Sequence, residues 1–299
     1  MKSRGRRIAI LLPLLLLAFG LRVHRIGEQR VWWDEGWSVW VARFSPLEIL
    51  RQTGNDVHPP LYFELLHVWR ALSGDSEAGL RLFSAFLGVL TIAMTYALGR
   101  RMARGTLSPS AATLAGVLAA LFLTVSRFTI AWSQEIRMYA LASLLAVLAV
   151  WAARRVWVHG GGGRRRDIAL YVLATTGGLY TLYLFAPVWA AINVAWLWSW
   201  RAAADRRRAF LRWAALQFAV LALFLPWLWY ASNGFLSTAS ATPIRLFDFL
   251  HIYWTVLTVG IPVDVAQFNW LTLPAAAVFL VAVVAVAAVA AAAGRRPPA

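Results

Sequence analysis

Eight long apolar stretches, separated by polar or basic segments, dominate the sequence. They cover residues 8–26, 80–99, 111–131, 136–153, 168–183, 185–200, 210–230 and 271–293. Each is close to the roughly 20 residues that an α-helix needs to cross a bilayer, so the pattern predicts about eight transmembrane helices. The fifth and sixth stretches are divided near residues 183–187, because residues 168–200 hold no charged side chain and are too long for one crossing.

The first stretch has an alternative interpretation. Its apolar core is short and follows four basic residues within positions 2–7, which is also typical of a cleaved signal peptide. A retained helix is favoured because the apolar pattern continues to Ile26, with Arg22 and Arg25 expected to extend outward toward the headgroups. The downstream topology is the same in both interpretations.

Composition supports a membrane protein. Hydrophobic residues make up 61% of the 299 positions and the mean hydropathy is +0.63, values too apolar for a soluble domain. The absence of cysteine excludes thiolate catalysis and thiolate metal sites. We therefore predict an all-α integral membrane protein whose residues 1–299 form a single polytopic domain, with no soluble C-terminal domain.

Charge indicates the orientation. If the stretches alternate across the membrane, one face receives 19 of the 29 Lys and Arg with only Asp167 and Asp205, a net charge of +17, and the other face carries −1. Cytoplasmic segments are rich in Lys and Arg, so both termini are predicted in the cytoplasm, and residues 27–79 and 231–270 form the first and last extracytoplasmic loops. This pattern also explains the net charge of +16 without a nucleic-acid partner.

The loop 27–79 is expected to contain short helices. Ser45, Pro46 and Glu48 resemble a capping box with proline at the first helical position, which predicts a helix from Pro46 that ends before Gly54. A second helix should follow the turn at His58-Pro59-Pro60. Both are predicted to lie along the membrane surface.

Three segments in the predicted outer loops carry candidate chemistry: Trp33-Asp34-Glu35, His58-Pro59-Pro60-Leu61-Tyr62 and Ser133-Gln134-Glu135-Ile136-Arg137-Met138-Tyr139. Their order and spacing resemble the GT-C superfamily of membrane glycosyltransferases. The likeness is to its protein O-mannosyltransferase and lipid A aminoarabinose transferase branch, glycosyltransferase family 39. It covers roughly residues 5 to 230. The resemblance implies a GT-C-like bundle, a sugar donor carried on a polyprenyl phosphate, and transfer to a protein, lipid or cell-wall glycan on the extracytoplasmic face of the cell membrane.

The resemblance also implies roles for these residues. Inverting glycosyl transfer needs a carboxylate to accept the proton of the acceptor hydroxyl and positive charge to stabilise the departing phosphate. By this likeness Asp34 is the candidate base, with Glu35 orienting it or the acceptor. Substrate binding is assigned to His58, Tyr62, Glu135, Arg137 and Tyr139. Arg137 is the candidate phosphate clamp, and the alternative is an arginine that reaches the headgroups while paired with Glu135.

A divalent metal is a further possibility, with Asp56 and His58 as ligands. Against it, relatives often have a histidine in the fifth span where this chain has Leu182. Two other functions stay open at this point: a transporter or flippase, and a GT-C scaffold without activity. A transporter or flippase usually has polar groups at mid-membrane depth. The predicted spans of this chain have few such groups beyond Asn193 and Gln217.

Overall fold

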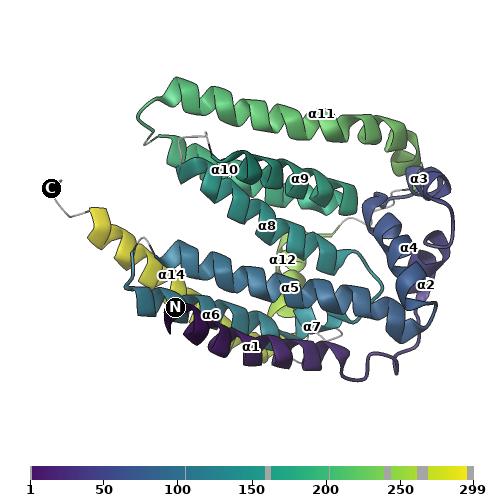
Figure 1. Cartoon of the computed structure of the whole chain (residues 1–299), viewed down its shortest axis with the longest axis horizontal. Coiled ribbons are helices and arrows are strands. Elements are labelled where there is room, and N and C mark those ends of the chain that lie inside the picture. Colours follow the sequence, from purple (N-terminus) through teal and green to yellow (C-terminus); the bar gives the residue numbers. More distant parts are fainter. Residues whose placement is uncertain are drawn as a thin grey trace.

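The described chain is entirely helical, as predicted. The computed structural model describes residues 2–104, 106–158, 163–201, 203–238, 244–260 and 269–294, and within them the regular structure consists of α-helices and two short 3₁₀ turns (Figure 1). The parts of the outer loop 231–270 at 239–243 and 261–268 lie outside the described residues.

A long helix overlaps each of the eight predicted stretches. These helices are α1 (Lys2–Val23), α5 (Glu77–Ala103), α6 (Pro109–Val125), α8 (Tyr139–Val158), α9 (Arg165–Thr181), α10 (Ala186–Trp200), α11 (Arg206–Thr238) and α14 (Thr272–Gly294). The predicted division of residues 168–200 is confirmed, because the 3₁₀ turn η1 (Tyr183–Phe185) separates α9 from α10. By length and composition, α5, α8 and α11 can each cross a membrane, and α6 joined with α7 (Arg127–Ser133) would make a fourth span among the described helices.

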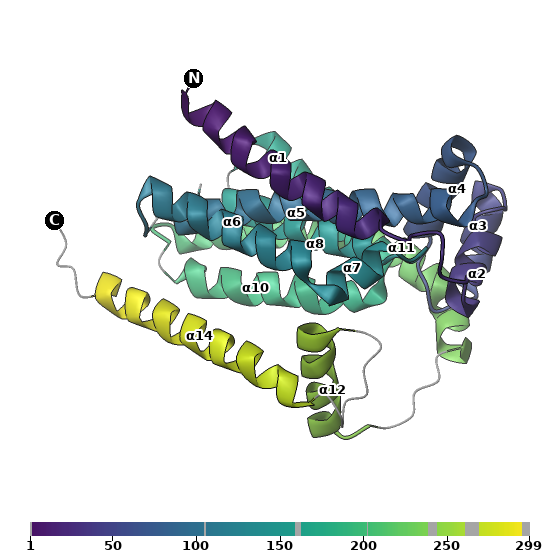
Figure 2. The same cartoon turned by 90° about the horizontal axis from the view of Figure 1, so that it is seen from below.

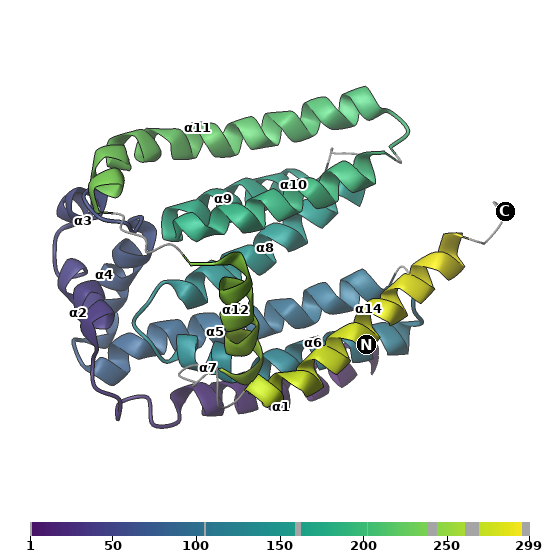
Figure 3. The ribbon, with the colours of Figure 1, turned by 180° about the vertical axis from the view of Figure 1, so that it is seen from behind.

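Helix α5 lies at the centre of one half of the bundle. It packs against α1, α6 and α8, while α8 continues the packing to α9, and α9 to α11 (Figures 1 and 3). The contact between α5 and α6 is close because Gly116 has no side chain: a Cβ there would come within 2.7 Å of the Tyr96 carbonyl oxygen. Small residues allow such close approach between helices in a membrane.

The third predicted span is not one straight helix, which corrects the prediction of a continuous span over 111–131. Helices α6 and α7 meet at Ser126 with a bend of 63°. The Ser126 hydroxyl accepts a hydrogen bond from the Thr129 amide (3.4 Å), and so caps a new helix. Residues 134–138 are not helical either, so α8 begins at Tyr139 and not at 136.

Arg22 fills this break, and the expectation that it extends outward is wrong. Its side chain is 0% exposed. The guanidinium donates hydrogen bonds to the carbonyls of Ala18, Leu123 and Thr124 and to the hydroxyls of Thr129 and Ser133, at 3.1 to 3.4 Å. Three of these partners belong to the ends of α6 and α7 that face the break, where the bend leaves carbonyls without helical partners.

The first predicted outer loop forms a separate layer at one end of the bundle, made of α2 (Trp33–Val41), α3 (Pro46–Gly54) and α4 (Leu61–Ser73) (Figures 1 and 2). The two predicted helices are confirmed as α3 and α4, although the Ser45 side chain makes no capping hydrogen bond. Helix α2 was not predicted. Placement of this layer on a membrane surface stays a prediction.

The last predicted outer loop also contains helical structure. Helix α11 continues beyond residue 230 to Thr238, and α12 (Leu246–Val259) and the 3₁₀ turn η2 (Asn269–Leu271) precede α14. Helix α12 contacts α7, so this segment returns to the same end of the bundle as the α6–α7 break (Figures 2 and 3).

Candidate functional site

Glu35 anchors the site to the bundle. Its two carboxylate oxygens accept hydrogen bonds from Arg81 Nη2 (2.7 Å) and Nε (2.9 Å), and both side chains are 1% exposed. Oε1 also accepts the Ile136 amide (2.9 Å). A buried ion pair with two parallel hydrogen bonds fixes the relative orientation of the two side chains and neutralises their charges. Glu35 therefore ties α2 to α5 and to the segment 134–138, which is a positioning role.

Asp34 faces the open side of the same helix turn. Its side chain is 37% exposed, and Oδ2 lies 3.6 Å from Arg137 Nη2. The Asp34 carbonyl accepts hydrogen bonds from Arg137 Nη1 (3.2 Å) and from the Ser38 hydroxyl (3.0 Å). The backbone of Asp34 is thus held, while its carboxylate remains accessible to a substrate.

Arg137 and His58 continue the site through hydrogen bonds. Arg137 is 2% exposed, and its Nη2 donates to His58 Nε2 at 3.0 Å. Because a guanidinium can only donate, Nε2 must accept, and the proton of the neutral ring sits on Nδ1, which donates to Asp56 Oδ2 (2.8 Å). Burial raises the pKa of Asp56, but hydrogen bonds from the His58 side chain and the Val57 backbone lower it, and the net pKa lies below its ordinary value.

Arg137 retains an unused donor. Its Nε is buried and has no hydrogen-bond partner among the described residues. The guanidinium also lies 5.7 Å from the ring centre of Tyr139, a cation–π distance. A buried arginine with an unsatisfied N–H can accommodate an anion at this position.

Glu135 adds a second carboxyl group beside Arg137. Burial, and then the charge of Glu35, raise its pKa from 4.5 to about 7. Its Oε2 is buried without a partner among the described residues. No ion pair with Arg137 forms here, in contrast to the alternative in which these two residues pair at the headgroups.

The two predicted tyrosines occupy different positions. Tyr62 is 0% exposed and packs against Phe63 and Phe83, where burial raises its pKa. It therefore offers no surface to a substrate in this structure. Tyr139 is half-buried and packs against Trp132 with tilted rings (4.0 Å between ring centres), and its own ring lies beside the Arg137 guanidinium.

The predicted metal ligands Asp56 and His58 are close together, but their contacts do not suit a cation. Both nitrogens of the His58 ring are already in hydrogen bonds, and Nε2 faces the positive Arg137. Within the described ranges, no group of three or more His, Asp or Glu residues is arranged to hold a metal ion. These side chains fit a hydrogen-bonded relay from Asp56 through His58 to Arg137 better than a metal site.

Arg81 is the site residue that sequence reasoning missed. It lies second in the predicted span 80–99, and the available signal was a charge inside an apolar stretch, which usually has a buried partner. Its Nη1 also donates hydrogen bonds to the carbonyls of Ile26 (2.9 Å) and Gln29 (2.8 Å). Arg81 therefore fixes the backbone at the start of the predicted outer loop.

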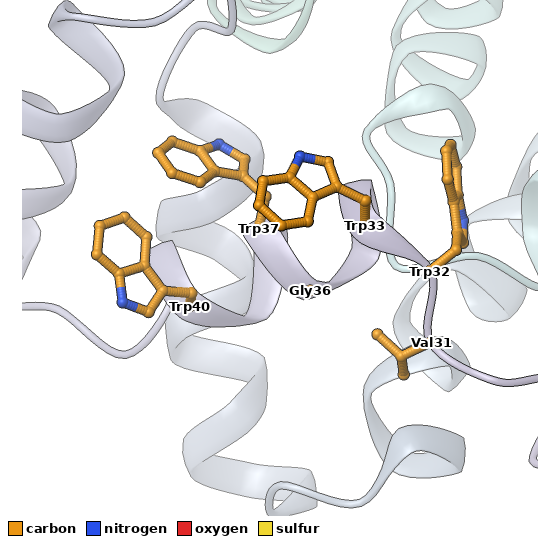
Figure 4. Close-up of a pocket in the computed structure, with 6 residues that line it drawn as sticks. All are labelled: Val31, Trp32, Trp33, Gly36, Trp37 and Trp40. Atoms are coloured by element: carbon orange, nitrogen blue, oxygen red, sulfur yellow. The ribbon is translucent and has the colours of Figure 1, made fainter.

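An open cavity of about 550 Å³ lies along α2. It is lined by Val31, Trp32, Trp33, Gly36, Trp37 and Trp40, and these six residues are called the tryptophan groove below (Figure 4). All of them belong to α2 or to the two residues before it.

Comparison with known proteins identifies a family and a similar fold. Residues 57–230, more than half of the chain, match the family described as dolichyl-phosphate-mannose-protein mannosyltransferase. A solved structure of the S. cerevisiae protein O-mannosyltransferase Pmt1-Pmt2 complex bound to the sugar donor has a similar fold, with a TM-score of 0.54 and 17% sequence identity. The match covers 85% of this chain and 34% of the yeast chain. No curated protein sequence matches significantly.

The described chain is all-helical, has several apolar helices and shares its fold with part of the yeast protein O-mannosyltransferase. The chain belongs to the dolichyl-phosphate-mannose-protein mannosyltransferase family. The matched segment contains His58, Glu135 and Arg137, but it begins after Asp34 and Glu35. The assignment of these two acids therefore depends on their contacts with the matched segment.

Proposed function

We propose that this protein is a membrane glycosyltransferase that moves a sugar from a polyprenyl-phosphate donor to a hydroxyl group of a protein, lipid or glycan acceptor. The proposal rests on the short distance between the side chains of Asp34 and Arg137. An accessible carboxylate lies 3.6 Å from a buried guanidinium that has an unused donor. Base and anion site are thus adjacent at one end of the bundle.

These groups support an inverting displacement. The acceptor oxygen forms a bond to the anomeric carbon of the sugar while the bond from that carbon to the phosphate oxygen breaks. The acceptor proton passes to the Asp34 carboxylate, and the electron pair of the broken bond leaves with the polyprenyl phosphate. Arg137, oriented by His58 and the Asp34 carbonyl, stabilises the charge that develops on this phosphate.

The membrane arrangement is part of the proposal. The eight helices over the predicted stretches would each cross the membrane, with the basic connections in the cytoplasm. The layer of α2, α3 and α4 would then lie on the extracytoplasmic face. In this orientation a donor with its prenyl chain in the bilayer can present its phosphate to Arg137.

The proposed displacement does not need a metal, because Asp56 and His58 hold Arg137 through hydrogen bonds and Arg137 is positively charged. EDTA is therefore expected to leave transfer unchanged, because Arg137 supplies the positive charge at the phosphate. Loss of transfer in EDTA, restored by a divalent cation, would instead support the predicted metal at Asp56 and His58.

A lipid-linked sugar assay tests the function. The full chain in bilayer nanodiscs is incubated with polyprenyl-phosphate mannose, glucose or aminoarabinose and a mixture of hydroxyl acceptors. Release of polyprenyl phosphate together with an inverted glycoside is the expected result. If a donor binds and moves between leaflets but is never cleaved, the transporter alternative replaces the transferase.

A further inference from the structure

The tryptophan groove exposes apolar surface on α2. Trp33 is 84% exposed, and Trp32 and Trp40 are each 44% exposed. Figure 4 shows the indoles of Trp33, Trp37 and Trp40 along α2, with Trp32 standing apart from them across Val31 and Gly36. Residues spaced by three or four along a helix share a face, which brings Trp33, Gly36, Trp37 and Trp40 together. A contiguous exposed apolar surface is a candidate binding site.

Gly36 is a second and independent observation. It lies within α2, where glycine lowers helix stability by about 1 kcal/mol relative to alanine. Its backbone has no positive φ, and a Cβ placed on it would meet only Val31 Cγ1, at 3.9 Å. Packing within the protein does not require a glycine here. Its effect is to leave the floor of the groove open, as is found where a ligand approaches the backbone closely.

We propose that the tryptophan groove binds a sugar ring of a carbohydrate acceptor and directs one of its hydroxyl groups to Asp34. This inference rests on the proposed function and names the acceptor class for the same site. Asp34 follows Trp33 directly on α2, so the candidate base lies one residue along the helix from the lining of the groove. One face of a pyranose ring presents C–H groups, which pack against the electron-rich face of an indole.

The position of the groove argues against the donor lipid as its occupant. The layer of α2, α3 and α4 lies at one end of the bundle, beyond the end of α1, whereas a prenyl chain would run alongside the apolar helices (Figures 1 and 2). The lining also has no acidic or basic side chain, which excludes selection of a charged acceptor group. Trp side chains provide flat apolar faces and N–H donors, which suit a neutral polyhydroxylated ring.

A binding experiment without turnover tests the groove. The full chain in nanodiscs is titrated with mannotriose, and binding is followed by saturation-transfer NMR. Trp33→Ala is expected to weaken binding by about twofold to tenfold, the effect of one aromatic contact, and Trp33→Tyr should retain part of it. Gly36→Ala should weaken binding similarly, because its methyl group would occupy space in the groove. The substitution should not disturb the fold, since the nearest atom, Val31 Cγ1, lies at 3.9 Å.

Two matched variants control for general effects. Trp198→Ala removes an indole that is 77% exposed on α10, and Gly20→Ala adds a methyl group into open space on α1; neither should change mannotriose binding. Equal binding by the parent, Trp33→Ala and Gly36→Ala would overturn the proposal. It would also be overturned if only a proline-rich peptide bound in a Trp33-dependent way, or if the variants changed only the association of α2 with lipid. Because no donor is present, these results are separate from the success or failure of sugar transfer.

Discussion

At the residue scale, Arg137 carries the proposed recognition of the donor. Arg137→Ala removes charge-assisted hydrogen bonds worth roughly 1.5 to 3 kcal/mol, so the affinity for a polyprenyl-phosphate sugar should fall by about one to two decades. Equilibrium binding of the donor to the purified variant measures this change. Arg137→Lys keeps the charge but loses the fork of donors and should bind with intermediate affinity. Unchanged affinity in Arg137→Ala would mean that the phosphate binds elsewhere.

The raised pKa of Glu135 implies that the stability of the folded protein depends on pH. Its folded-state pKa of about 7 lies above the ordinary value of 4.5, so the folded protein holds this proton more tightly than the unfolded chain between these pH values. Stability is therefore lost as pH rises through that window. Thermal unfolding of Glu135→Gln should show a smaller loss between pH 5 and 7 than the parent. Identical pH profiles would show that Glu135 ionises normally.

Sequence reasoning identified the residues of the site better than their partners. Asp34, His58 and Arg137 were predicted from short segments that each contain their own signal, and the structure brings all three together. Arg81 pairs with Glu35 across 46 positions, and nothing local in the sequence specifies that contact. The roles assigned to these residues remain predictions that mutation must test.

At the scale of elements, the break between α6 and α7 depends on Arg22. Arg22→Met would remove the hydrogen bonds from the guanidinium to the break, and leaving a buried acceptor such as the Thr124 carbonyl without a donor costs about 1 to 3 kcal/mol. The variant should unfold at a clearly lower temperature in nanodiscs. Gly88→Ala should act in the same direction, because its Cβ would lie 2.9 Å from Arg22 Nε.

Arg25→Met is the matched control for this prediction. The Arg25 side chain is 68% exposed and pairs only with Glu28 on the surface, so its loss should change stability little. If Arg22→Met and Arg25→Met unfold at the same temperature as the parent, the hydrogen bonds of Arg22 do not stabilise the break.

The elements that hydropathy predicted well are the long ones. Every predicted stretch contains a helix, because apolar length is a property of the local sequence. The bend at Ser126 was missed because the stretch 111–131 is continuously apolar, and the bend is stabilised by Arg22 from another helix. Helix α2 was missed because its nine residues are few and rich in tryptophan, which has only a modest helix propensity.

At the scale of the whole molecule, charge asymmetry predicts the orientation. The chain has no native cysteine, so Asp75→Cys, next to α4, and Arg165→Cys, at the start of α9, each introduce a single exposed label site. A membrane-impermeant maleimide added to intact cells should label position 75 and not position 165. Labelling of both positions, or of position 165 alone, would contradict the proposed orientation.

The most direct test of the account is Asp34→Asn, assayed for donor binding and for sugar transfer in the same preparation. Asparagine keeps the shape of the side chain but cannot accept the acceptor proton, so transfer should fall by about two to four decades, the usual contribution of a general base. Donor affinity should stay within about threefold of the parent, since Arg137 remains in place. Transfer at close to the parental rate would contradict the assignment of Asp34 as the base, and with it the proposed mechanism.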